Sequence, residues 1–360
     1  MIAPNWSLVL PGFTYSGRDP DGFMGKDEVV DHLVRYARSF GAPVQEGVRV
    51  VSVERDANDT GFLVRSEGED VIKADQIVLA TGALQRPNLP AAAQSIPGSV
   101  TQVVAPNYRN PASLPEGAVL VVGSGETGAQ VAEELARAGR TVYLSGGRSW
   151  WAPRRYRGKD VARWFRLTGW FDRTVDDLPP GARTGQPNPQ LTGGDGGHAI
   201  SSRTVAREGV TLLGRLEGVS DGFAYFADDL AENLAWADDQ ARRLLRDVDA
   251  LVERDGLDAP AEEWPADLRS DDAANEPGPT AVDLRHGIGT VIWATGYRPD
   301  FGWVRLPFTD DRGYPIQRRG VTRIPGLYVL GLDWLYTAKS GLFAGIDEDA
   351  THLAQIVAAH

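Results

Sequence analysis

Residues 118–148 read AVLVVGSGETGAQVAEELARAGRTVYLSGGR, and this stretch decides the fold. The apolar run at 118–122 predicts a short buried strand, and 129–139 predicts a helix that Gly139 ends. A second strand is expected over 141–145. The three segments make a strand–helix–strand unit, and apolar runs of this kind are typical of a parallel sheet that is covered on both faces.

The turn between strand and helix carries three glycines with the spacing G-x-G-x-x-G. Gly123 permits a tight turn, Gly125 lets a pyrophosphate approach the backbone, and Gly128 lets helix and strand pack closely. The start of the helix would also offer N–H groups to the phosphates. The pattern predicts a dinucleotide site, with a merely structural turn as the alternative; its residues are Gly123, Ser124, Gly125, Thr127 and Gly128.

The end of the second strand indicates which nicotinamide dinucleotide binds. Sites for NAD usually have Asp or Glu there, whereas this chain has Arg148 followed by Ser149. A guanidinium pairs with a 2′-phosphate, so we expect NADPH. Glu126 lies inside the turn, where its charge disfavours phosphate binding unless the side chain points outward or acts at the start of the helix.

The remaining patterns predict a second domain around this unit. Helices are expected over 27–40, 226–254 and 345–358, and strands over 48–53, 61–65, 76–80, 210–219, 289–293 and 327–330. The fold class is therefore α/β, with a nucleotide-binding domain at 116–283 inserted into a domain made of 1–115 and 284–360. The segment 226–283 is expected to be a helical, acidic insertion, and 179–197 a Gly/Pro-rich loop.

Composition excludes several classes of protein. The chain has 360 residues and a net charge of −12, so we expect no nucleic-acid partner. With no cysteine there is no disulfide, thiolate metal site or dithiol relay. No apolar run approaches the length of a membrane span and no signal peptide is visible, so we expect a cytoplasmic protein with no membrane partner. The five scattered histidines indicate no metal site.

Four segments together resemble the flavin-containing monooxygenase family. They are the glycine turn with Arg148, two Ala-Thr-Gly motifs (80–82 and 294–296), the segment PGLYVLGLDW at 325–334, and the opening segment from Pro4 to Met24. The resemblance implies two dinucleotide-binding, Rossmann-like domains that bind FAD and NADPH. It also implies a monooxygenase, in which C4a-hydroperoxyflavin oxygenates a small organic substrate at nitrogen, sulfur or a carbonyl group.

The resemblance assigns further site residues. Asn5 matches an asparagine at the flavin edge and is the candidate catalytic residue. The two Ala-Thr-Gly motifs mark the crossings between the domains, and the C-terminal segment contacts FAD. The residues implied for the cofactors are Thr81, Gly82, Thr295, Gly296, Gly331 and Asp333.

One family feature is not found in this sequence. Members begin with a G-x-G-x-x-G unit for FAD, and this chain has only the unit at 123–128, so we expect an FAD domain that is incomplete at its N-terminus. The alternative function is an NADPH-binding sensor or remnant without catalysis. Two structural alternatives also stay open: the aromatic residues at 150–171 form core or a substrate pocket, and the helix at 226–254 packs on the core or joins a homodimer.

Overall fold

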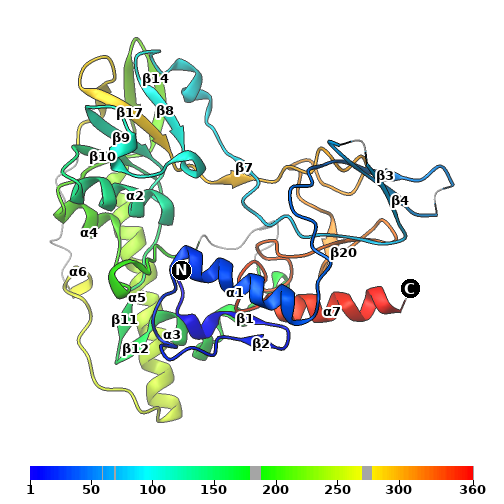
Figure 1. Ribbon diagram of the computed structural model, residues 1–360. Coiled ribbons are helices and arrows are strands. Elements are labelled where there is room, and N and C mark those ends of the chain that lie inside the picture. Colours follow the sequence, from blue (N-terminus) through cyan, green and yellow to red (C-terminus); the bar gives the residue numbers. More distant parts are fainter. Residues whose placement is uncertain (59, 69, 179–187, 270–277, 360) are drawn as a thin grey trace.

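The structure is a computed structural model that describes residues 1–58, 60–68, 70–178, 188–269 and 278–359. The chain forms two bodies and crosses between them in two extended segments (Figure 1). Residues 179–187 of the loop expected at 179–197 lie outside the described residues.

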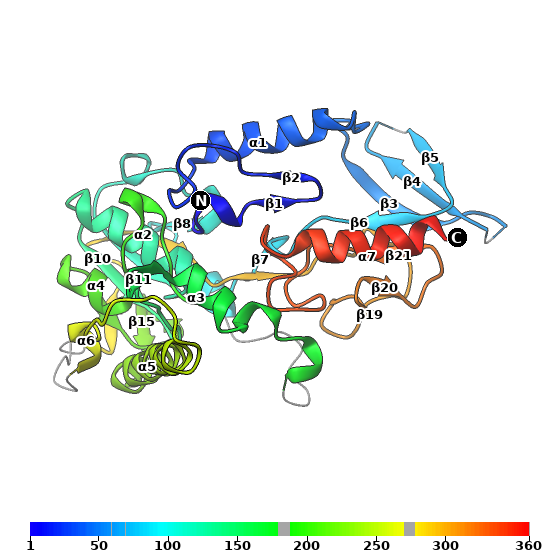
Figure 2. The ribbon, with the colours of Figure 1, turned by 90° about the horizontal axis from the view of Figure 1, so that it is seen from below.

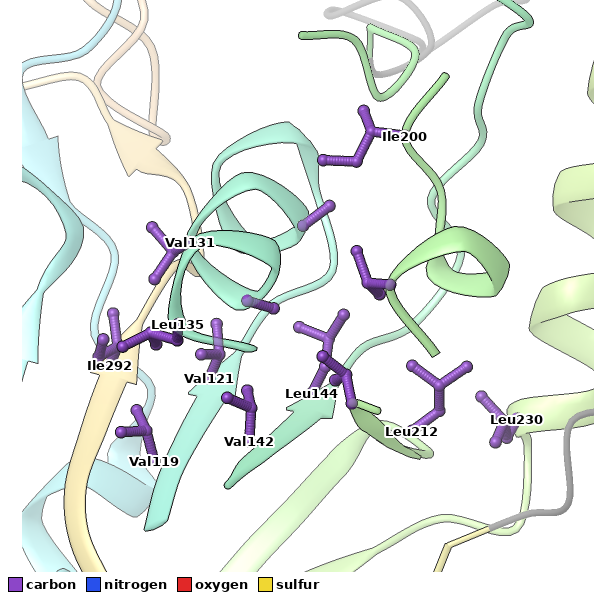
Figure 3. Close-up of a cluster of buried hydrophobic side chains, with 14 of the residues drawn as sticks. Val119, Val121, Val131, Leu135, Val142, Leu144, Ile200, Leu212, Leu230 and Ile292 are labelled. Carbon is purple, nitrogen blue, oxygen red and sulfur yellow. The ribbon is translucent and has the colours of Figure 1, made fainter. Parts of the chain in front are cut away.

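The first body is built on strand β9, which is apolar on both faces. Val119 and Val121 face helix α2 and pack with Leu135, while Leu120 and Val122 face the opposite side. Figure 3 shows Val119, Val121 and Val142 lining the helix-covered face. The parallel sheet has the order β13-β10-β9-β17-β8 and consists of β8 (Thr101–Val104), β9 (Ala118–Val122), β10 (Val142–Ser145), β13 (Thr211–Leu213) and β17 (Ile288–Trp293).

Each face of this sheet has its own cover. Helices α2 (Glu126–Arg137) and α4 (Ser202–Arg207) cover one face. An antiparallel sheet packs on the other through Phe226 and Val282, and it consists of β14 (Leu216–Ser220), β15 (Phe223–Phe226) and β16 (Ala281–Asp283). The prediction of a doubly covered parallel sheet is therefore confirmed.

Strand pairing corrects three expectations about this body. Strands β8 and β17 are hydrogen-bonded into the sheet, so the sheet extends beyond the expected limits of 116 and 283. The expected strand 210–219 is two strands that belong to different sheets, because the chain turns at 214–215. Helix α2 begins at Glu126, three residues before the expected start, and it ends near Gly139, whose φ is +78°.

The insertion carries a long helix that packs onto an aromatic cluster. Helix α5 (Leu230–Asp255) presents Leu244, Leu245 and Val248 to Trp150 and Trp164. The smaller elements of this region are β11 (Arg155–Tyr156), β12 (Lys159–Asp160), α3 (Val161–Leu167) and α6 (Ala266–Arg269). The expectation that the helix packs on a core is confirmed.

The second body combines segments from both ends of the chain. Its core includes Phe62, Leu79, Phe308 and Val329. One sheet is an antiparallel meander of β3 (Val50–Arg55), β4 (Phe62–Ser66) and β5 (Val71–Ala74). The other has the order β19-β20-β21-β6 and consists of β6 (Ile77–Leu79), β19 (Gln317–Arg318), β20 (Val321–Thr322) and β21 (Leu327–Val329), with β6 and β21 parallel.

Two helices and a hairpin complete this body. Helix α1 (Lys26–Ser39) runs beside the hairpin of β1 (Val9–Leu10) and β2 (Phe13–Thr14), as Figure 2 shows, and the Phe13 ring contacts His32 and Tyr36. The closing helix α7 (Ile346–Ala358) contacts β1. The helices expected at 27–40 and 345–358 are therefore confirmed to within a residue or so.

The chain crosses between the bodies in two antiparallel segments, β7 (Arg86–Pro87) and β18 (Tyr297–Arg298). The Asn88 amide donates to the Gly296 carbonyl at 2.9 Å, and the Thr295 hydroxyl donates to the Asn88 carbonyl. β18 directly follows the Ala-Thr-Gly motif at 294–296, and residues 83–85 separate β7 from the motif at 80–82. The prediction that these motifs mark the domain crossings is confirmed (Figure 1).

Candidate functional site

Two glycines of the turn are fixed by packing. A β-carbon at Gly123, whose φ is +108°, would lie 2.3 Å from the Ala294 carbonyl oxygen. A β-carbon at Gly128 would lie 1.7 Å from the Gly123 carbonyl oxygen. The backbones of β9, α2 and residues 294–295 therefore approach one another too closely for a side chain at either glycine.

Gly125 differs because it faces open space. It is the N-cap of α2, and a β-carbon there would meet nothing within 4 Å. The open space lies beside the first N–H groups of the helix, where the fold favours a phosphate. Ser124 is buried and accepts a hydrogen bond from Gln190 at its carbonyl, whereas Thr127 is exposed on the first turn of α2.

Arg148 and Ser149 follow β10 at the same edge of the sheet. The Arg148 side chain is 55% exposed and forms an ion pair with Glu232 on α5. Its guanidinium carbon also lies 6.0 Å from the centre of the Trp236 ring. Sequence reasoning found Arg148 but not its acidic partner, because 84 residues separate the two.

The second group of expected cofactor residues gathers in the other body. Strands β6 and β21 are parallel neighbours, so Thr81–Gly82 and Gly331–Asp333 follow their carboxyl ends at one edge. The Leu330 amide donates to the Leu79 carbonyl at 2.9 Å, which holds the two ends together. Thr295 and Gly296 follow β17 and lie on the crossing between the two groups.

A cavity of about 940 Å³ lies between Glu126 at the start of α2 and residues 339–348, which precede and begin α7. It is lined by residues of the first ten positions, the start of α1, the start of α2, α3 and the segment before α7. Its apolar wall includes Trp6, Phe165, Trp170, Phe171 and Phe343. The aromatic residues at 150–171 thus divide between two roles, since Trp150 and Trp164 are core while Phe165, Trp170 and Phe171 also line the cavity.

Glu126 also lines this cavity. Its Oε1 atom is buried and has no hydrogen-bond partner within the protein. Burial raises the pKa of Glu126 to about 7, and a backbone hydrogen bond from Leu191 and the charge of Arg154 partly oppose this rise. The carboxyl group therefore faces the cavity, not bulk solvent, and it titrates near neutral pH.

Lys339, in the segment that precedes the closing helix, lies at the cavity wall and is bonded to two acids. It donates to Asp172 at 2.8 Å and to Glu348 at 2.6 Å, which ties the segment before α7 to the turn after α3 and to α7 itself. Asp172 is 167 residues away from Lys339, so no local pattern marks this pair.

Asn5 lies beside the cavity, and its amide group is engaged in the N-terminal loop. Its side-chain oxygen accepts from the Met24 amide at 2.7 Å, and its side-chain nitrogen donates to the Asp19 carbonyl at 2.9 Å. These bonds position the loop that carries Trp6 and Ser7. A catalytic role for Asn5 stays a prediction.

The described residues include neither a membrane-crossing helix nor a metal site. None of their helices is long and apolar enough to cross a membrane. Within the same residues, no cluster of three or more His, Asp or Glu side chains is arranged to hold a metal ion.

Known proteins share this architecture. The family described as pyridine nucleotide-disulphide oxidoreductase matches residues 11–166. The flavin-containing monooxygenase from Stenotrophomonas maltophilia has a TM-score of 0.64 at 16% identity, covering 100% of this chain and 84% of that one. The structure of OTEMO in complex with FAD and NADP has a TM-score of 0.50 at 15% identity, covering 100% of this chain and 76% of that one. The fold is thus that of flavoprotein oxidoreductases with two dinucleotide-binding domains.

A sequence relative gives the family. An uncharacterized oxidoreductase of Geobacillus kaustophilus, named CzcO-like, is 31% identical over 362 residues, covering 100% of this chain and 85% of the relative. The chain belongs to the CzcO-like oxidoreductases, and it shares its fold with the flavin-containing monooxygenase.

Proposed function

We propose that this protein is an NADPH-dependent flavoprotein monooxygenase that oxygenates a small organic substrate at nitrogen, sulfur or a carbonyl group. The observation that carries the proposal is the cavity of about 940 Å³ that reaches the start of α2 at Glu126 and has an aromatic wall. This wall suits an apolar substrate, and Glu126 belongs to the same turn as the candidate nicotinamide site.

The residues of the first body fit a nicotinamide dinucleotide. The open space over Gly125 accepts a pyrophosphate at the start of α2, while Gly123 and Gly128 keep the turn tight. Arg148 and Ser149 lie where the 2′-phosphate of NADPH would be bound.

The residues of the second body fit one part of FAD. Thr81, Gly82, Gly331 and Asp333 share the edge where parallel strands of such folds bind ligands. A bound flavin would supply the transfer of electrons from NADPH to O₂. The glycine-rich turn expected for the FAD pyrophosphate is not among these residues, so flavin binding is the part of the proposal that most needs a test.

The protein's own contribution is to shape and dry the cavity. Trp170 and Phe171 exclude water from the substrate, which protects a reactive species from wasteful breakdown. Glu126 holds or releases a proton at its carboxyl oxygen near neutral pH, as a general acid–base group does.

The proposal is tested by spectroscopy and turnover on the purified chain. The chain is mixed with FAD and gel-filtered, and the bound flavin is read from its visible absorbance. NADPH consumption is then followed with an amine, a sulfide and a ketone, and incorporation of isotopically labelled O₂ into the product is measured. Labelled product supports a monooxygenase, whereas NADPH oxidation that yields only peroxide contradicts it.

A second candidate function is an NADPH-binding protein without catalysis. It is favoured by the single glycine-rich turn, which fits nicotinamide and leaves the flavin pyrophosphate without an equivalent. A chain that binds NADPH but retains no flavin after mixing supports this second candidate over the first.

A further inference from the structure

Two arginines lie at the edge of the nicotinamide site. Arg148 follows β10, and Arg215 follows β13, the next strand in the sheet. These strands are parallel with Ser145 opposite Leu213, and the Ser145 hydroxyl donates to the Gly214 carbonyl at 2.8 Å. Their carboxyl ends therefore place both arginines at the edge that carries the glycine turn.

The two side chains flank one glycine. A β-carbon at Gly147 would lie 3.7 Å from Cδ of Arg215, so the Arg215 side chain runs along the backbone just before Arg148. Both side chains are accessible, with exposed fractions of 55% for Arg148 and 64% for Arg215. A ligand placed over Gly147 would have a guanidinium on each side.

The start of α5 supplies an acid to each arginine. Glu232 pairs with Arg148, and Asp229 lies 3.7 Å from Nε of Arg215. Asp229 is itself held by the Arg215 backbone amide at 2.9 Å, and Asn233 donates weakly to the Gly146 carbonyl. Figure 3 shows Leu230, the first residue of α5, beside Leu212 of β13. The insertion therefore contacts the nicotinamide site directly.

The two acids differ in how readily a phosphate would displace them from their arginines. Asp229 is anchored by a backbone hydrogen bond, and its separation from the Arg215 guanidinium is longer than a hydrogen bond. Glu232 is 68% exposed and has only a side-chain partner, so its pair with Arg148 is a surface ion pair of small net value. A phosphate dianion would replace Glu232 more readily than it would move Asp229.

We propose that Arg148 and Arg215 together bind the 2′-phosphate of NADPH, and that Glu232 is a competing counter-ion which lowers the affinity. The inference rests on the proposed use of NADPH and adds a second specificity residue, Arg215, and an opposing one, Glu232. Two guanidinium groups can each form charge-assisted hydrogen bonds to separate phosphate oxygens. Removing Glu232 frees Arg148 for the ligand before it arrives.

The test measures dissociation constants of NADPH and NADH for the full chain, without turnover. Arg215→Ala is expected to raise the Kd for NADPH by about tenfold and to leave that for NADH unchanged, because only NADPH carries the phosphate. Glu232→Gln is expected to lower the Kd for NADPH several-fold, again without effect on NADH. Arg207→Ala is the matched control, since Arg207 is 58% exposed and paired with Asp267 on the same body.

A second pair of probes separates this inference from the proposed function. Adenosine 2′,5′-bisphosphate and 5′-AMP differ only in the 2′-phosphate, and calorimetry measures both without a flavin or nicotinamide. If the wild-type chain prefers neither NADPH over NADH nor adenosine 2′,5′-bisphosphate over 5′-AMP, both the NADPH assignment and the inference are overturned. The inference alone is overturned if Arg215→Ala keeps the wild-type preference for adenosine 2′,5′-bisphosphate as fully as the control Arg207→Ala does.

Discussion

Gly125 and Gly128 lie three residues apart, yet they are glycines for different reasons. Gly128 has no room for a methyl group, so Gly128→Ala is expected to destabilise the fold by about 2–4 kcal/mol. Gly125→Ala is expected to change stability by less than about 1 kcal/mol and to weaken NADPH binding, because the methyl group enters the open space. Urea unfolding and NADPH titration measure the two effects. Equal losses of stability would contradict this assignment.

Glu126 is expected to make stability depend on pH. Burial raises its pKa to about 7 from the ordinary 4.5, so ionisation of the carboxyl lowers the free energy of unfolding. This loss develops as the pH rises from about 4.5 to about 7 and is complete above that range. Glu126→Gln should therefore stabilise the protein at pH 8, by about 2 kcal/mol, and have little effect at pH 4.

Denaturant unfolding at the two pH values tests this prediction. Glu253→Gln is the control, because Glu253 is exposed on α5. The prediction fails if the two variants show the same difference between pH 8 and pH 4.

At the scale of elements, the buried carboxylate of Asp238 links helix α5 to the first body. Asp238 accepts hydrogen bonds from Arg203 at 2.7 Å and from the Trp151 indole at 3.0 Å. Asp238→Ala would leave the buried Arg203 charge unpaired, so a loss of about 3–5 kcal/mol is expected. The neighbouring Asp239 pairs with Arg243 on the surface, and Asp239→Ala should cost less than about 1 kcal/mol. Thermal unfolding that ranks the two variants equally would contradict this reading of α5.

Elements with a clear local pattern could be predicted from the sequence. Strand β9 was predicted at its exact bounds and α5 within a few residues, since apolar runs and helical periodicity are local properties. Strands β5 and β8 are not predicted by the sequence, because each is short and carries polar or exposed side chains. Their pairing partners, not their residues, make them strands.

At the scale of the molecule, the candidate site could be predicted only in part. The glycine turn, Arg148 and the crossings come from contiguous motifs, and the structure brings them together as parallel strands require. The cavity could not be predicted, because Trp6, Glu126, Phe165 and Lys339 meet only after both bodies have folded. The same holds for Glu232, which reaches Arg148 through the insertion.

The exposed apolar side chains of the described residues are unevenly distributed, since most of them lie before residue 90. Val30 on α1 and Phe40 just after it are 56% and 62% exposed, whereas the body built on β9 has few such residues. Exposed apolar side chains favour association where they gather on one face. We therefore expect the chain to form a homodimer through the α1 face, with twice the chain mass of 39.0 kDa in light scattering.

Charge placed on that face should separate the two copies. Val30 and Val34 lie one helical turn apart on the exposed side of α1. The double variant Val30→Lys, Val34→Lys is therefore expected to shift the mass to that of one chain without unfolding it. Tyr225→Lys on β15 is the control, because Tyr225 is 40% exposed on the other body. A wild-type chain that stays at 39.0 kDa across micromolar concentrations contradicts the prediction, and so does a control that dissociates the dimer equally well.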